Sequence, residues 1–211
     1  MTTDTPVVPL LIFPCNGNGL EALDCLGEAY RCLGFVDDTS EKQGRNVHGF
    51  PVFDRRVLAE RADARVLAVP GSPSSYRSRR GIIEGLGLDA DRFARVIHPA
   101  ARVSPLAVVG RNVLVMSGTV ITSNAIIGDH VCVLPNTVIH HDVVVGAWSL
   151  IGSNVTIAGG TSVGENCYIG SGSSIMNGLR LEAAALVGMG STVIHDVPAT
   201  ARVVGNPARQ I

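Results

Sequence analysis

An aliphatic residue recurs at every sixth position through the second half of the chain. Three positions after it, residues that tolerate a positive φ recur, such as Asn124, Asn136 and Asp142. A fixed period of this kind marks a repeat that stacks on itself, whereas a buried helix would need a period of 3.6. The pattern predicts a parallel β-helix of triangular section, in which each six-residue unit supplies one strand and one corner. The inward positions are Ile97, Val103, Val109, Val115, Ile121, Ile127, Val133, Ile139, Val145, Ile151, Ile157, Val163, Ile169, Ile175, Leu181, Val187 and Val193.

The first half of the chain has a different pattern, in which short apolar runs alternate with helical spacing. Strands are predicted in "VVPLLIFPC", at 34–38 and at 64–71, with a short extended stretch at 49–54. Helices are predicted at 20–33, from the spacing of its Leu and Tyr residues, and at 74–86. This alternation predicts a small parallel sheet with helices on its faces. We therefore expect a Rossmann-like α/β domain at residues 1–96 and a β-helix at residues 97–211.

Charge supports the boundary, because residues 1–96 hold 12 of the 17 basic and 13 of the 18 acidic residues. The net charge of −1 favours neither nucleic acid nor an anionic membrane as a partner. Five cysteines without a CxxC pair indicate reduced, buried thiols in a cytoplasmic protein. The N-terminus has no basic region typical of a signal peptide, and no apolar run is long enough to span a bilayer.

A glycine-rich turn follows the first predicted strand. Gly17-x-Gly19-x-x-Ala22, with Asp37 and Asp38 further on, fits the dinucleotide-binding fingerprint. About 95 residues leave no room for the second half-sheet of a true dinucleotide site, so the mononucleotide portion of a ligand fits better. Three arginines in the second predicted helix could contact phosphate, but we interpret them as a solvated helix face: Arg77, Arg79 and Arg80.

The repeat also carries two histidines beside a carboxylate. Ile139 points inward, so His141 is expected next to a prism edge, adjacent to the corner residue Asp142, while His140 is not. A neutral imidazole can accept a proton from an amine or hydroxyl, and a neighbouring carboxylate can fix its tautomer. A purely structural role for the pair is the alternative. The remaining histidines are interpreted as structural or surface groups: His48, His98, His130 and His195.

The segments "NGNGLEA…GFVDD", "IHHD" and "VVGNPARQI", around a loop-free repeat, together resemble one family. It is the left-handed β-helix, hexapeptide-repeat sugar acetyltransferases. These include the sialic acid O-acetyltransferases and the nucleotide-sugar 4-amino N-acetyltransferases of bacillosamine and perosamine biosynthesis. The resemblance implies a homotrimeric enzyme of O-antigen or related glycan biosynthesis, with acetyl-CoA between subunits, His141 as general base beside Asp142, and no metal.

The same resemblance assigns two binding regions. The sugar nucleotide is expected at Asn16, Gly17, Asn18, Asp37, Asp38 and Gly71. Acetyl-CoA is expected at Gly170, Ser171, Gly188 and Met189, with "GNPA" at 205–208 closing its groove. Many members carry a second His nine residues after the base, followed by Pro-Gly. Here Leu150 stands in that place and Gly152-Ser153 follows.

We therefore expect acetyl transfer to the 4-amino group of a GDP- or UDP-linked sugar, with the carrier and the sugar undetermined. O-acetylation of a sialic acid is the alternative within the enzyme class. A metalloenzyme of carbonic-anhydrase type would need three His ligands, and the usual His-x4-His spacing is absent. A non-catalytic trimer that binds a sugar nucleotide is the third alternative.

Overall fold

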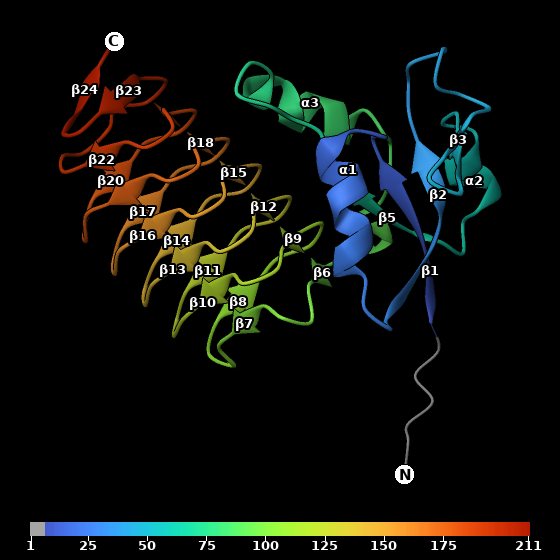
Figure 1. Ribbon diagram of the computed structural model, residues 1–211, viewed down its shortest axis with the longest axis horizontal. Coiled ribbons are helices and arrows are strands. Elements are labelled where there is room, and N and C mark those ends of the chain that lie inside the picture. Colours follow the sequence, from blue (N-terminus) through green and yellow to red (C-terminus); the bar gives the residue numbers. More distant parts are fainter. Residues whose placement is uncertain (1–6) are drawn as a thin grey trace.

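The computed structural model describes residues 7–211, so residues 1–6 of the predicted first domain lie outside the described residues. An α/β unit lies at one end of the molecule and a stack of coils extends away from it (Figure 1). The C-terminus lies at the far end of the stack.

The α/β unit is built on a five-stranded sheet in the order β3-β4-β2-β1-β5. All neighbouring pairs are parallel except β3 and β4. Its strands are β1 (Val8–Phe13), β2 (Tyr30–Val36), β3 (Asn46–Val47), β4 (Phe50–Phe53) and β5 (Arg65–Ala68). Its helical segments are α1 (Gly17–Glu21), η1 (Ala22–Cys25), α2 (Val57–Glu60), η2 (Tyr76–Ser78), α3 (Arg79–Glu84) and η3 (Ala90–Arg92).

The helix predicted at 20–33 is wrong in length and position. The helical segment runs from Gly17 to Cys25, and Gly27 then takes a φ of 54°, which a continuing right-handed helix does not allow. From Tyr30 the chain is extended and pairs with β1 as β2. The apolar spacing that suggested one helix is therefore shared between a helix face and a strand.

The predicted β-helix is confirmed as a stack of two-residue strands. Seventeen strands, β6 to β22, follow one another every six residues, and each ends on one of the predicted inward aliphatics. Strands eighteen residues apart pair in parallel, as Val120 does with Val138, so three units complete one coil. The three resulting sheets are the flat faces of the prism.

Face 1 consists of β6 (Val96–Ile97), β9 (Leu114–Val115), β12 (Cys132–Val133), β15 (Leu150–Ile151), β18 (Tyr168–Ile169), β21 (Leu186–Val187), β23 (Arg202–Gly205) and β24 (Ala208–Gln210). Face 2 consists of β7 (Arg102–Val103), β10 (Val120–Ile121), β13 (Val138–Ile139), β16 (Thr156–Ile157), β19 (Ser174–Ile175) and β22 (Thr192–Val193). Face 3 consists of β8 (Val108–Val109), β11 (Ile126–Ile127), β14 (Val144–Val145), β17 (Ser162–Val163) and β20 (Arg180–Leu181).

The interior of the prism is aliphatic and contains no charged side chain in the described residues. Ile139, Ile151 and Ile157 are fully buried, and small polar side chains fill the positions between them. The hydroxyl of Thr137, for example, donates to the carbonyl of Gly152 at 2.7 Å. The Asn, Asp and Gly residues predicted at corners all take a positive φ. The six-residue pattern therefore fixes both the core and the turns.

The outer surface of the prism differs from face to face. On face 1 the outward residues Leu114, Cys132, Leu150 and Leu186 are buried in one cluster with the α/β unit. The side chain of Asn112 also bonds both the N–H and the carbonyl of Ala68 in β5. The α/β unit therefore covers face 1.

Face 3 is open, and its outward residues include an apolar stripe of Val108, Ile126 and Val144, which are 61%, 46% and 39% exposed. Within residues 7–211, no helix has both the length and the apolar character needed to cross a bilayer.

Candidate active site

His141 and Asp142 lie at the corner where face 2 turns into face 3, between β13 and β14. The His141 Nδ1 and the Asp142 Oδ2 are 2.7 Å apart. Because an ionised carboxylate can only accept, Nδ1 carries the hydrogen and Nε2 of the neutral ring is left with a free lone pair. Both side chains are more than half exposed, so the ring can be reached from solvent.

A second contact holds the carboxylate in place. The Asn124 amide, one coil earlier at the same corner, donates to Asp142 Oδ1 at 3.0 Å. The hydrogen bond from His141, followed by the one from Asn124, lowers the pKa of Asp142. The carboxylate therefore stays ionised at neutral pH and fixes the tautomer of the ring.

The neighbouring histidine has no comparable partner. His140 is half-buried, and within residues 7–211 its ring makes no hydrogen bond to another residue. The geometry therefore separates the two histidines, and His141 is the one with the arrangement of a general base.

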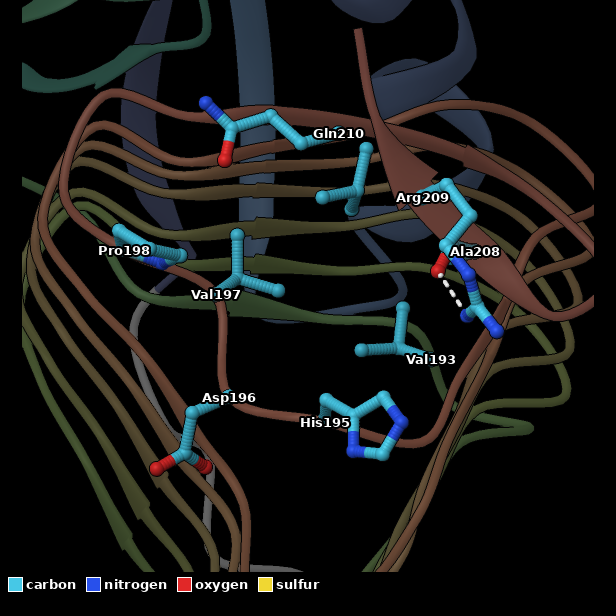
Figure 2. A pocket seen from close by; sticks show the side chains of 9 residues that line it. Val193, His195, Asp196, Val197, Pro198, Ala208, Arg209 and Gln210 are labelled. Atoms are coloured by element: carbon cyan, nitrogen blue, oxygen red, sulfur yellow. Dashed lines mark hydrogen bonds between the residues drawn. The ribbon is translucent and has the colours of Figure 1, made fainter.

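A second His-Asp sequence lies in the same column, three coils later, at His195 and Asp196 (Figure 2). Both residues line a cavity at the open end of the prism, together with Arg209 and Gln210. Asp196 accepts from the backbone N–H of Arg180, and in the described part of the chain no hydrogen bond joins it to His195. The sequence His-Asp alone is therefore not sufficient for the paired geometry.

The glycine-rich turn is held by its own side chains. Asn16 caps α1, and its side-chain oxygen accepts from the N–H of Gly19 at 2.9 Å. A Cβ on Gly19 would lie 2.3 Å from the carbonyl oxygen of Pro14, so this position requires glycine. Gly17 has open space around it, and its backbone is accessible to a ligand.

A cavity of about 220 Å³ lies between this turn and face 1. Of the predicted nucleotide-binding residues, Asn18 and Gly71 line it. The other lining residues are Ser72, Pro73, Leu134, Leu150, Ile151, Gly152 and Tyr168. Leu134 and Tyr168 were not among the predicted site residues, although their places on or beside face 1 follow from the six-residue register.

Leu150 closes one side of this cavity. It is 6% exposed, and a Cβ on Gly71 would lie 2.8 Å from its Cδ1. The position at which the family resemblance predicts a second His is therefore filled here by the packed side chain of Leu150. No imidazole is available at this point to polarise a carbonyl group.

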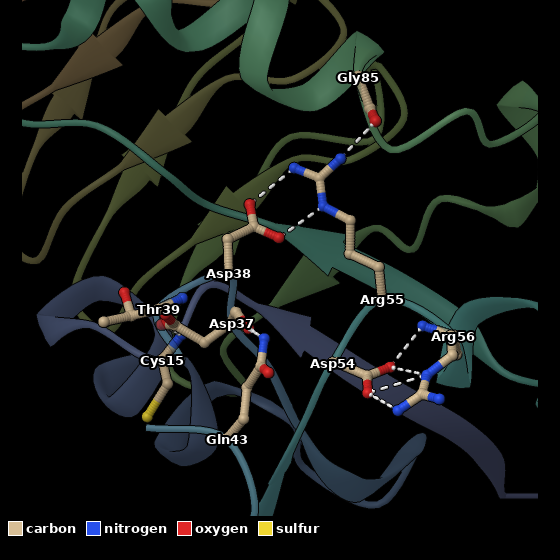
Figure 3. Close-up of polar contacts among 9 residues, drawn as sticks. All are labelled: Cys15, Asp37, Asp38, Thr39, Gln43, Asp54, Arg55, Arg56 and Gly85. Carbon is tan, nitrogen blue, oxygen red and sulfur yellow. Dashed lines mark hydrogen bonds and ion pairs between the residues drawn. The ribbon is translucent and has the colours of Figure 1, made fainter. Parts of the chain in front are cut away.

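Asp37 and Asp38 do not form one site, because their side chains have separate partners (Figure 3). Asp37 is buried and accepts from the backbone N–H groups of Cys15 and Thr39 and from Lys42 Nζ. Burial would raise the pKa of Asp37, but the hydrogen bonds from Thr39 and Lys42 outweigh it, and the pKa is lowered. Lys42, the only lysine in the sequence, was not predicted as a partner of Asp37.

Asp38 makes a two-pronged ion pair with Arg55, at 2.6 Å to Nε and 2.7 Å to Nη2 (Figure 3). Arg55 also donates to the carbonyl of Gly85 at the end of α3. Asp38 therefore ties β2 to α3. Its prediction as a nucleotide contact stays a prediction, and the ion pair already occupies both of its oxygens.

The interpretation of the three arginines as a solvated face is wrong for Arg79. Its side chain is fully buried and donates to the carbonyl oxygens of Pro70 and His130. Burial lowers the pKa of Arg79 to about 10, so it remains protonated at neutral pH. Arg77 donates to the carbonyl of Thr200, and Arg80 pairs with Glu84. The hydrogen bonds of Arg77 and Arg79 thus hold the segment after Gly71 against the β-helix.

The predicted acetyl-CoA residues lie on a different edge from His141. Gly170 and Ser171 follow β18, and Gly188 and Met189 follow β21, so all four are at the corner where face 1 turns into face 2. Met189 is 73% exposed, and the strands that precede these pairs stack directly on one another. Gly152, in the lining of the cavity, belongs to the same edge.

The predicted site residues therefore lie on two separate edges of the prism. The cavity lined by Asn18 and Gly71 and the Gly170–Met189 corner share the edge between faces 1 and 2, whereas His141 is on the edge between faces 2 and 3. Among the described residues, no group of three His, Cys, Asp or Glu side chains could hold a metal ion.

Comparison with known proteins identifies the repeat. Residues 106–141, 124–159 and 142–177 match the family model described as bacterial transferase hexapeptide (six repeats). No curated protein matches the sequence.

Several solved structures match over nearly the whole chain. One is a variant of perosamine N-acetyltransferase from Caulobacter crescentus in complex with CoA and GDP-perosamine. It has 28% identity over 97% of this chain and 96% of that chain, with a TM-score of 0.82. Another is the acetyltransferase domain of PglB from Neisseria gonorrhoeae FA1090 in complex with acetyl coenzyme A, with 27% identity over 98% and 100% of the chains and a TM-score of 0.85. These matches confirm the resemblance to the hexapeptide-repeat sugar acetyltransferases.

The depressed pKa of Asp37 predicts a pH-dependent contribution to stability. A carboxyl with a lowered pKa in the folded state stabilises fully above its unfolded pKa, and this contribution disappears as the pH falls through the folded value. We expect Asp37→Asn to lower the thermal midpoint at pH 7 and to flatten its decline below about pH 4. Melting curves from pH 7 to pH 3 measure this.

Asp38→Asn is the matched control, because Asp38 is the neighbouring residue but half-exposed in its ion pair. A smaller loss is expected, since exposed ion pairs contribute at most about 1 kcal/mol. Equal losses for the two variants at pH 7 would contradict the special role of Asp37.

Proposed function

We propose that this acyltransferase of the left-handed β-helix, hexapeptide-repeat type transfers the acetyl group of acetyl-CoA to the 4-amino group of a nucleotide-linked sugar. The observation that carries the proposal is the His141–Asp142 pair with a free Nε2 at the corner of a repeat that matches bacterial transferases. The two similar enzymes, one with CoA and GDP-perosamine and one with acetyl coenzyme A, support the donor and the class of acceptor.

The Rossmann-like α/β domain, residues 1–96, holds the nucleotide in this proposal. Gly17 leaves backbone open to a ligand, and Asn18 and Gly71 line the adjoining cavity against face 1. Asn16 and Asp37 act there mainly by fixing the turn, because their side-chain oxygens already accept from it. We place the enzyme in the cytoplasm, because its five cysteines are unpaired in the structure.

The acetyl-CoA groove is assigned to the Gly170–Ser171 and Gly188–Met189 corner, on three features. The corner is loop-free, its Ser171 and Gly188 are partly exposed, and the exposed Met189 offers an apolar contact for the pantetheine arm. The turn from Gly205 to Ala208, between β23 and β24, closes the end of the same face.

The chemistry is direct attack within a ternary complex. The amine nitrogen attacks the thioester carbonyl carbon while His141 Nε2 accepts the proton that the nitrogen loses. The negative charge on the carbonyl oxygen is stabilised by other N–H donors, since the side chain of Leu150 has no hydrogen-bond donor. The C–S bond then breaks, and the leaving CoA thiolate regains a proton from His141. Asp142 stabilises the imidazolium that forms in between.

A cysteine nucleophile is disfavoured by the thiols themselves. Burial raises the pKa of Cys25 to about 12 and that of Cys132 and Cys167 to about 11. Such thiols stay protonated at neutral pH, and the thiolate is the nucleophile. Direct transfer therefore needs no acetyl-enzyme intermediate.

A homotrimer completes the site. The base and the nucleotide cavity lie on different edges of one prism, so a reacting pair needs the edge of a neighbouring copy. The exposed stripe of Val108, Ile126 and Val144 on face 3 adjoins the edge that carries His141. Packing that stripe against another copy would bury it and bring the two half-sites together.

Release of CoA thiol from acetyl-CoA tests the activity. We expect release with a 4-amino sugar linked to GDP or UDP, and none with the free nucleotide or with the 4-hydroxy sugar, because the amine is the nucleophile. Release with a sialic acid instead would support O-acetylation. Nucleotide binding without release from any acceptor would indicate the non-catalytic alternative.

The role of the base has its own test. His141→Asn should lower kcat by about 10²–10⁴, the usual contribution of a general base, while the circular dichroism spectrum and the KM for the nucleotide sugar stay close to normal. His140→Asn is the matched control and should keep its activity. Normal turnover by His141→Asn would refute the assignment.

Mixed trimers test whether the site is shared between copies. His141→Asn removes the base, and Ser72→Trp fills the cavity that Ser72 lines. After the two inactive variants are unfolded and refolded together in equal amounts, a shared site pairs an intact base with an intact cavity at about one quarter of interfaces. About 25% of wild-type activity is therefore expected. A site formed within one chain would give none.

A further inference from the structure

The His141 ring lies against the next coil of the prism at Gly159. A Cβ built on Gly159 would lie 2.7 Å from both Cε1 and Nε2 of the ring and 3.2 Å from Cδ2. Distances under 3 Å between such atoms do not occur without displacement of one of them. The ring therefore occupies the space that any side chain at residue 159 would need.

The backbone conformation at residue 159 does not require a glycine. The φ of Gly159 is not positive, whereas the φ of its neighbour Gly160 is 69°. At the equivalent corner of other coils, eighteen residues apart, the chain carries Ser123, His141, Asn177 and His195. The fold therefore accepts a side chain at this place in the other coils, and the coil that faces the ring is the exception.

The contact also bears on the hydrogen bond to Asp142. The ring is confined between the Asp142 carboxylate at Nδ1 and the backbone of residue 159 at its opposite edge. The backbone at this edge is fixed, because the N–H of Gly160 donates to the His141 carbonyl and the N–H of Gly178 donates to the Gly159 carbonyl. A side chain at 159 would thus move the ring rather than the coil.

We propose that Gly159 is a positioning residue for His141: the missing side chain leaves room for the Nε2 edge of the imidazole beside the next coil while Nδ1 stays on Asp142. The kinetic part of this proposal rests on the proposed function. The structural part, the tautomer of the ring, does not.

Gly159→Ala is the test. We expect kcat to fall at least ten-fold and the KM for the nucleotide sugar to change less than three-fold, because the displaced ring loses its carboxylate partner. In ¹⁵N spectra of the imidazole, the wild-type protein should show the Nδ1–H tautomer and the variant a mixture of both. Unchanged spectra and unchanged kcat would overturn the proposal.

The control is Gly178→Asn, at the next corner of the same column as Gly160. Gly178 has a φ of 71° and open space at its Cβ, and asparagine takes the same conformation at Asn124 and Asn154. This variant adds a larger side chain to the same edge but not against the ring. It should keep both activity and tautomer.

A double variant separates action through the ring from general damage. In a His141→Ala background there is no ring to displace, so adding Gly159→Ala should change neither the residual kcat nor the thermal midpoint. If the single variant fails to fold, the double variant should still fold. A further ten-fold loss in the double variant, or a failure of both to fold, would show that Gly159 acts independently of the ring and overturn the proposal.

The outcomes remain distinct from those of the proposed function. If His141→Asn is fully active, the general base is wrong, yet the tautomer change in Gly159→Ala can still be observed. If His141→Asn is inactive and Gly159→Ala keeps the wild-type tautomer and rate, the base stands and the positioning role fails.

Discussion

Burial of one aliphatic side chain in every six determines the geometry of the whole prism. Each buried side chain brings the chain back to a corner, and three such steps return the backbone to pair with itself eighteen residues later. The same count places His141 above Ser123 and below Gly159, and Asp142 above Asn124. The corner that carries His141 and Asp142 is therefore positioned by the hydrophobic core.

The repetitive half of the chain was predictable because its information is local and redundant. Every inward residue, and every corner residue with positive φ that the pattern named, is found where it was expected. The corner position of His141 beside Asp142 followed from the same register. The pairing with Asn124 also follows once coils of eighteen residues are counted, since the two residues share one column.

The α/β half was harder to predict because its outcome depends on tertiary contacts. The spacing from Leu20 to Leu33 suits a helix, but Gly27 ends the helical segment, and pairing with β1 makes a strand of the rest. Arg79 looks like part of a solvated face in sequence, yet its carbonyl partners come from Pro70 and from a distant coil. Neither partner leaves a signal near Arg79 in the sequence.

The eighteen-residue coil also limits which insertions and deletions the stack can accept. Gain or loss of a complete coil before β13 would slide the imidazole along the prism axis and keep it on its edge. Gain or loss of a single hexad would instead rotate every later residue by a third of a turn and carry the imidazole to another edge. Length variation in such a chain is therefore tolerated in whole coils, and smaller insertions must leave the stack as loops.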